Sequence, residues 1–114
     1  MNECLFCKIV ARTIPAALVY EDDLVVAFDD INPQAPTHTL VIPRKHVVSI
    51  AELQELDVGL LGHLMLAGNK IAKLKGITDT GYRFVVNTGA HGGQSVFHLH
   101  LHVLGGRHMA WPPG

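Results

Sequence analysis

Three histidines recur at alternate positions near the end of the 114-residue chain, in the segment His98-Leu99-His100-Leu101-His102. Successive side chains of a β-strand point to opposite faces, so this spacing places the three imidazoles on one face and the leucines on the other. A row of bases is costly to bury, because each ring loses hydration and charged neighbours repel. Imidazole titrates near neutrality, with an unperturbed pKa of about 6.5. The row therefore indicates a chemical site rather than an ordinary core strand.

A glycine-rich turn, Gly92-Gly93-Gln94-Ser95, directly precedes the histidine row. Glycine tolerates unusual backbone angles, and consecutive backbone N–H groups in such a turn can converge on an anion. Ser95 adds a hydroxyl donor, and Asn87 ends the strand expected beside it. Most glycine-rich turns are only connections, but beside three imidazoles this one is a candidate phosphate cradle.

The elements that must position these residues follow from the hydrophobic pattern. We expect a short helix, a long helix and five strands, at residues 5–10, 53–74, and 18–20, 24–28, 39–42, 82–87 and 99–104. Ser49 and Glu52 have the spacing of a capping box, but glycines weaken the long helix, which begins either there or after a break near Asp57. Gly76 suits the left-handed position that ends a helix. Strands joined by tight turns with one long helix predict an α+β fold with an antiparallel sheet.

Length and composition bound what the chain can be. With 48% hydrophobic residues, we expect one domain over residues 1–114 with a buried core. The net charge of −1 offers no basic surface for nucleic acid, and no apolar run approaches the ~20 residues that span a bilayer. The start, Met1-Asn2-Glu3-Cys4, does not resemble a signal peptide. We therefore expect a cytoplasmic protein without nucleic-acid or membrane partners, whose Cys4 and Cys7 are thiols or metal ligands rather than a disulfide.

These motifs together resemble the histidine-triad (HIT) superfamily. Its pattern is His-φ-His-φ-His-φ-φ, with φ an aliphatic residue, and residues 98–104 fit it throughout. The resemblance covers nearly the whole chain and looks like the Hint branch, the histidine-triad nucleotide-binding proteins. The other matching segments are Phe6-Cys7-Lys8-Ile9, Tyr20-Glu21-Asp22-Asp23, Asp30-Ile31-Asn32-Pro33-Gln34-Ala35-Pro36-Thr37-His38, Leu61-Gly62-His63-Leu64-Met65, Gly92-Gly93-Gln94-Ser95 and Trp111-Pro112-Pro113-Gly114.

The resemblance implies an assembly and an activity. Two subunits would form a homodimer in which two five-stranded sheets join into one of ten strands. The enzyme would be a purine nucleoside phosphoramidase, which cleaves the P–N bond of adenosine 5′-phosphoramidates into AMP and an amine. The stiff terminus Trp111-Pro112-Pro113-Gly114 would pack near the partner's active site and help select the amine.

The resemblance also implies roles for particular residues. His100 would be the nucleophile that becomes nucleotidylated, without a catalytic metal, and His98 belongs to the same triad. His102 or Ser95 would relay a proton to the leaving amine. Read alone, Asp30 would be a turn cap. The implied nucleotide-binding residues are Asp30 and Ile31 at the ribose and base, Asn87, Gly93, Gln94, Ser95, His100 and His102 at the phosphate, and Leu5, Phe6, Ile9 and Phe28 at the purine.

Other functions stay open at this stage. Related branches hydrolyse dinucleoside polyphosphates or transfer nucleotidyl groups, but they commonly carry Gln at the third triad position, where this chain has His102. A nucleotide-binding interaction module with incidental hydrolysis would use the same pocket. A module that used the triad only to bind metal would leave Asn87 and the glycine-rich turn without a role.

Cys4 and Cys7 form a C-x-x-C spacing, which suits tetrahedral zinc but needs two further ligands. Family members with both cysteines resemble zinc proteins, and by that resemblance a structural zinc would be bound by Cys4, Cys7, His46 and His98. Thioredoxin-like chemistry lacks its βαβ context here, whereas unliganded packing thiols remain an alternative. Four more histidines are expected to be solvated or polar core residues, namely His38, His63, His91 and His108.

Overall fold

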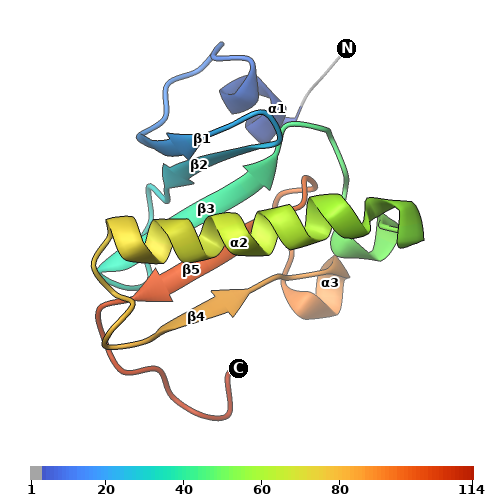
Figure 1. Ribbon diagram of the computed structural model, residues 1–114. Coiled ribbons are helices and arrows are strands. Elements are labelled where there is room, and N and C mark those ends of the chain that lie inside the picture. Colours follow the sequence, from blue (N-terminus) through green and yellow to red (C-terminus); the bar gives the residue numbers. More distant parts are fainter. Residues whose placement is uncertain (1–3) are drawn as a thin grey trace.

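Five strands form one antiparallel sheet in the spatial order β1-β2-β3-β5-β4 in the computed structural model, which describes residues 4–114 (Figure 1). The strands are β1 Leu18–Glu21, β2 Val25–Asp29, β3 Thr37–Pro43, β4 Tyr82–Val85 and β5 Leu101–Gly105. The α+β fold with a five-stranded sheet is confirmed. The prediction that the start of the chain does not resemble a signal peptide rests largely on residues 1–3, which lie outside the described residues. Within residues 4–114, no helix combines the length and apolarity needed to cross a membrane.

Helices cover opposite faces of the sheet, because the strand residues alternate between two hydrophobic clusters. Val25 and Ala27 of β2 pack in the cluster that includes α2, the long helix Val58–Leu74. Their neighbours Val26 and Phe28 pack in the other cluster, with α1, the short helix Leu5–Val10. Both faces of the central strands are therefore buried. The histidine row lies on the face that α1 covers.

The long helix begins at Val58, so the alternative with a break near Asp57 is correct. Ser49 does cap a helical turn by accepting a hydrogen bond from the Ala51 N–H, but that turn is a 3₁₀ segment of three residues, Ile50–Glu52. A second 3₁₀ segment, Glu55–Asp57, follows and leads into α2. The capping-box spacing therefore marks a local turn and not the start of the long helix, because the next residue, Leu53, is extended.

The end of α2 matches the glycine prediction. Gly76 has a positive φ of 71°, and the Ile77 N–H donates back to the Ala72 carbonyl at 3.0 Å. This return bond is the left-handed helix ending that glycine favours. The chain then enters β4, which lies at one edge of the sheet.

The histidine segment joins the regular strand ladder only at Leu101, later than the predicted start at residue 99. Leu101 pairs with Val41, and continuation of that register would place Leu99 opposite Pro43. Proline has no backbone N–H and cannot donate to a ladder. The Leu99 N–H instead donates to the Val47 carbonyl at 2.7 Å, outside the ladder.

Candidate active site and metal centre

The three histidines lie on one face although only one of them belongs to the regular part of β5. Leu99, Leu101 and Val103 are buried in the cluster that includes α2. The His100 and His102 rings lie next to each other, with centroids 4.9 Å apart. The alternation expected from the sequence is therefore present in the structure.

A cavity of about 410 Å³ opens beside this row. Its volume lies in the range of small-molecule sites, and its walls are predominantly apolar, with a few polar groups. The apolar wall comes from α1, the residues after it, and β2 and β3. The lining residues are Leu5, Phe6, Ile9, Ile14, Pro15, Ala16, Phe28, Asp29, Asp30, Ile31, Leu40, Ser95, Val96, His100 and His102.

His100 is held as a neutral ring with one nitrogen available. Its Nδ1–H donates to the His98 carbonyl oxygen at 2.7 Å. That bond leaves the proton on Nδ1 and the lone pair on Nε2. Burial lowers the pKa of His100, opposed by the same hydrogen bond and by the Asp30 charge. The edge of Phe6 packs against the ring, with centroids 5.1 Å apart and an interplanar angle of 89°. A neutral imidazole with a bare nitrogen at a cavity is the state that a nucleophile requires.

His102 pairs with a histidine to which the sequence assigned no role. The His38 Nε2 and His102 Nδ1 atoms are 2.8 Å apart, and the Asp30 carboxylate lies 3.4 Å from the same His38 nitrogen. Burial lowers the pKa of His102 to about 4, reinforced by His100 and His38. Burial likewise lowers the pKa of His38. Both rings are therefore neutral near pH 7. His38 was missed because its partner lies 64 residues away across the β3–β5 pair, and only the strand register brings the two together.

The glycine-rich turn includes one helical turn, α3 Gly89–Gly92, which ends at Gly93 with a positive φ of 80°. Gln94 follows and is buried. Its side-chain amide donates to the Val48 and Val96 carbonyls at 2.6 and 3.1 Å. Its amide oxygen accepts from the Gly89 N–H at 3.0 Å. Gln94 therefore holds the turn together, and Ser95 is the residue of this turn that lines the cavity.

The sequence-predicted residues divide between the cavity and its supports. Asp30 and Ile31 lie at the cavity, and Ile31 is almost fully exposed. The Asp30 carboxylate also accepts from the Asn32 N–H at 2.9 Å, so the turn-cap reading is correct alongside the placement at the site. Asn87 and Gly93 are outside the cavity lining of the described chain.

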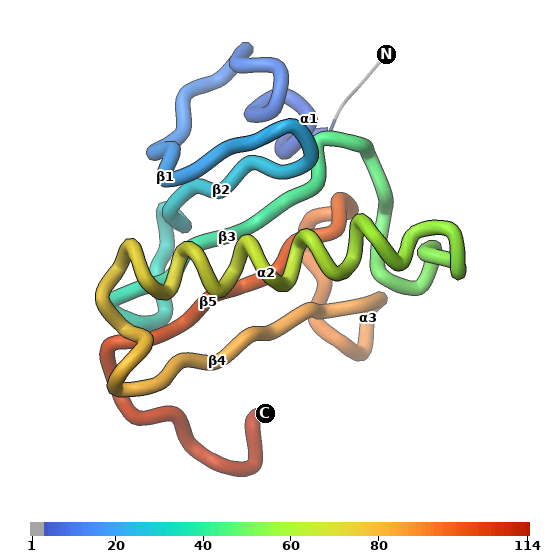
Figure 2. Tube along the Cα trace, in the orientation of Figure 1, coloured from blue at the N-terminus to red at the C-terminus, as the bar shows by residue number. Residues whose placement is uncertain are grey.

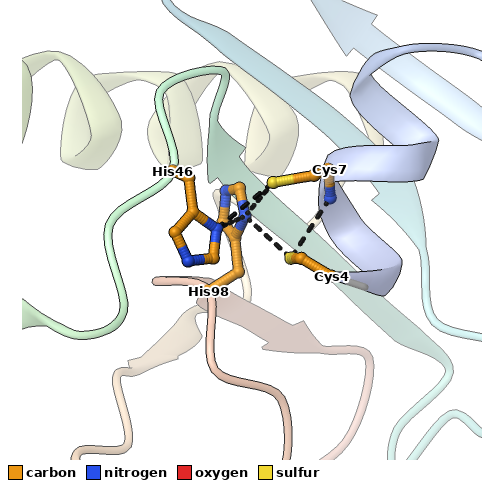
Figure 3. A group of neighbouring side chains, drawn as sticks. All are labelled: Cys4, Cys7, His46 and His98. Atoms are coloured by element: carbon orange, nitrogen blue, oxygen red, sulfur yellow. Dashed lines mark hydrogen bonds between the residues drawn. The ribbon is translucent and has the colours of Figure 1, made fainter. Parts of the chain in front are cut away.

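Figure 3 shows a second cluster, in which four side chains from distant segments converge. Cys4 and Cys7 come from the start of α1, His46 follows β3, and His98 begins the histidine row. One sulfur or nitrogen atom of each lies within 4.8 Å of the others. The His98 Nε2–H donates to the Pro43 carbonyl at 2.8 Å, which leaves Nδ1 to face the other three side chains.

The separations in this cluster fit a tetrahedral metal. The His98 Nδ1 atom lies 3.3 and 3.5 Å from the Cys4 and Cys7 sulfurs, and 3.2 Å from the His46 Nδ1. The Cys7 sulfur is 3.2 Å from the His46 Nδ1. A tetrahedron with Zn–S of about 2.3 Å and Zn–N of about 2.0 Å has edges of about 3.3–3.8 Å. The measured edges agree within a few tenths of an ångström, so these residues fit a two-thiolate, two-imidazole zinc site.

Comparison with known proteins shows the family to which the chain belongs. The HIT domain family model matches residues 11–109. The chain belongs to the HIT domain family. An uncharacterized HIT-like protein of Synechococcus elongatus is 54% identical over 113 residues, which cover 99% of this chain and 98% of the relative. The crystal structure of a HIT family hydrolase from Legionella pneumophila is 50% identical, with a TM-score of 0.96, and the match covers 98% of this chain and all of the other.

A second similar structure bears on the cysteine–histidine cluster. It is a Zn-bound histidine triad family protein from Mycobacterium smegmatis, 33% identical, with a TM-score of 0.81. The match covers 92% of this HIT protein and 76% of the other chain. The chain is therefore a hydrolase-like protein of the HIT family, and its row of three histidines lies within the matched residues.

Proposed function

We propose that this HIT protein is a Hint-type purine nucleoside phosphoramidase that hydrolyses adenosine 5′-phosphoramidates to AMP and an amine. The observation that carries the proposal is the state of His100, whose Nδ1–H is bound to the His98 carbonyl and whose Nε2 is left as a nucleophile at an apolar-walled cavity. An apolar slot suits a purine ring, and a neutral imidazole suits attack on phosphorus.

The proposed reaction has two displacements. The His100 Nε2 attacks phosphorus, the new N–P bond forms, and the P–N bond to the amine breaks. The amine leaves only when it gains a proton, which His102 or Ser95 relays. Water then attacks the nucleotidyl-histidine, gives one proton back to the relay, and releases AMP with neutral His100. No step requires a metal.

The remaining site residues take binding roles in this proposal. Phe6, Ile9 and Phe28 would enclose the purine, with Leu5 at the rim. Asp30 and Ile31 would contact the ribose and base. Donors around the phosphate would be Asn87, Gly93, Gln94, Ser95 and His102, where Gln94 acts mainly by holding the turn.

We also propose a structural zinc at Cys4, Cys7, His46 and His98, within a single HIT domain over residues 1–114. The donor set and its spacing support it, as does the Zn-bound relative from Mycobacterium smegmatis. When bound, the metal would tie α1 to the segment after β3, which carries His46, and to the segment before β5, which carries His98. Since Phe6 of α1 packs against His100, this link would also support the cavity wall.

The quaternary proposal is a homodimer with a continuous ten-stranded sheet. Strand β4 lies at the edge of the sheet order and has an open side for pairing. Leu66 on α2 is 62% exposed, which leaves apolar surface that a partner subunit would cover. We place the protein in the cytoplasm.

The test is release of AMP from adenosine 5′-phosphoramidate by the purified protein. His100→Ala should lower kcat by on the order of 10³-fold, as loss of a covalent nucleophile does. Near-normal turnover by that variant would refute the assigned nucleophile. Faster cleavage of diadenosine polyphosphate than of the phosphoramidate would favour a dinucleoside polyphosphate hydrolase. Tight AMP binding without single-turnover nucleotidylation would favour a binding module.

A further inference from the structure

The C-terminal segment that follows β5 contacts the loop before β3 through one arginine. Figure 2 shows this segment turning away from the sheet after β5. Arg107 donates from Nε and Nη2 to the Gln34 carbonyl at 3.2 and 3.0 Å, and from Nη1 to the His108 carbonyl at 3.0 Å. Two donors of one guanidinium therefore hold Gln34, and the third binds the C-terminal segment itself, which fixes Gln34 relative to the exit of β5.

The local backbone explains why the two segments meet so closely. Gly106 has a positive φ of 91°, and a Cβ atom there would lie 2.8 Å from the Pro36 Cβ. Only glycine tolerates both the angle and the approach. The turn at Gly106 therefore brings Arg107 against the loop that carries Gln34.

Gln34 in turn determines where the protons lie on His38. Its backbone N–H donates to the His38 Nδ1 at 3.0 Å. Since a backbone N–H can only donate, the His38 Nδ1 must accept, and the proton of the neutral His38 ring lies on Nε2. The nearest acceptor for that proton is the His102 Nδ1 at 2.8 Å, with the Asp30 carboxylate farther away at 3.4 Å.

The same reasoning then determines the tautomer of His102. Because its Nδ1 accepts from His38, the proton of the neutral His102 ring lies on Nε2. This nitrogen is buried and has no hydrogen-bond partner among residues 4–114. A buried donor without a partner carries a desolvation cost, which a substrate oxygen or nitrogen at the adjoining cavity would relieve.

We propose that Arg107 is a positioning residue which, by holding Gln34, orients His38 and thereby keeps the His102 proton on Nε2, where the N–H can donate a hydrogen bond to the substrate. The chain of contacts runs from Arg107 to the Gln34 backbone, to His38 and to His102. The part of this inference that concerns reaction rate rests on the proposed phosphoramidase function. The part that concerns the tautomer is independent of it.

The experiment makes two measurements on each variant: ring-nitrogen NMR spectra of His102 in substrate-free protein, and steady-state kinetics. In the wild type, Nε2 should be protonated and Nδ1 bare. Arg107→Ala should give a mixture of the two tautomers and lower kcat for adenosine 5′-phosphoramidate by about fivefold, the rate equivalent of one hydrogen bond, with KM unchanged. Arg107→Lys, which keeps one donor group, should give intermediate values for both measurements.

Arg83→Ala is the matched control. Arg83 is a second arginine that binds the C-terminal segment, through the Ala110 carbonyl at 3.1 Å, but it does not donate to Gln34. This variant should keep the wild-type tautomer of His102. A pure Nε2-protonated His102 in Arg107→Ala, or an equal change in Arg83→Ala, would overturn the inference. If the wild type released no amine, the proposed function would fail while the spectra still decided the role of Arg107.

Discussion

Gln94 closes the turn before the histidine row through three hydrogen bonds of its buried side-chain amide. They reach the Val48 carbonyl, the Val96 carbonyl and the Gly89 N–H at 2.6, 3.1 and 3.0 Å. Gln94→Ala removes all three and leaves their partners unsatisfied. At about 1 kcal/mol for each bond, the free energy of unfolding should fall by about 3 kcal/mol. Because the turn carries Ser95 to the cavity, kcat should fall as well.

Urea denaturation of the two variants Gln94→Ala and Ser95→Ala separates structural from chemical effects. Ser95 is exposed, so its substitution should change stability by no more than about 0.5 kcal/mol, whereas its activity should fall if it relays a proton. Gln94→Glu keeps the acceptor for Gly89 but loses both donors, and it should also be destabilised. A Gln94→Ala protein as stable as the wild type would refute the view that this side chain holds the turn.

Three further outcomes are expected. If zinc binds as proposed, protein with free zinc a thousandfold above its Kd should be about 4 kcal/mol more stable to unfolding than protein treated with a strong chelator. Cys7→Ala should lack zinc by elemental analysis, and a chelator should not change its stability. The pKa of His102 is about 4 in the folded protein and near 6.5 in the unfolded chain, so the unfolded chain binds more protons between these pH values. The free energy of unfolding, followed by urea denaturation, should therefore fall as pH falls from 6.5 towards 4. The fall should be smaller in His102→Asn. Trp111 is 81% exposed, and residues 111–114 are proposed to help select the amine. Deletion of these residues should alter relative rates across a series of amine leaving groups more than it alters cleavage of the unsubstituted phosphoramidate. Unchanged relative rates would contradict a role in amine selection.

The sequence predicted the fold because its main signals are local. The helix at residues 5–10 agrees with α1, and the strand positions agree with the sheet to within a few residues at their ends. The ends differ where the partner segment decides them. Residues 98–100 leave the ladder because their register reaches Pro43, and no property of the histidine segment itself reveals that.

The support of the site depends on contacts between segments distant in sequence, and it was accordingly not predicted. His38 is a buried polar core residue, one of the two predicted alternatives, but its contact with His102 across the β3–β5 pair was not predicted. The placement of Gln94 at the phosphate stays a prediction, whereas the hydrogen bonds by which its side chain stabilises the turn were not predicted. In both cases the residue type was visible in the sequence, while the hydrogen-bond partner was set by tertiary packing.

His98 explains how the metal cluster and the histidine row can share one residue without competing for it. Its Nδ1 faces Cys4, Cys7 and His46, its Nε2–H is bound to the Pro43 carbonyl, and its ring does not line the cavity of the described chain. Its backbone carbonyl, however, accepts the Nδ1–H of His100 and so determines which nitrogen of that ring is bare. If zinc and the nucleophile are as proposed, the side chain of His98 serves the metal cluster and its main chain serves His100. Under that proposal, metal binding and catalysis would be linked through the His98 backbone carbonyl, which accepts the His100 Nδ1–H, and the metal would stay away from the reacting atoms.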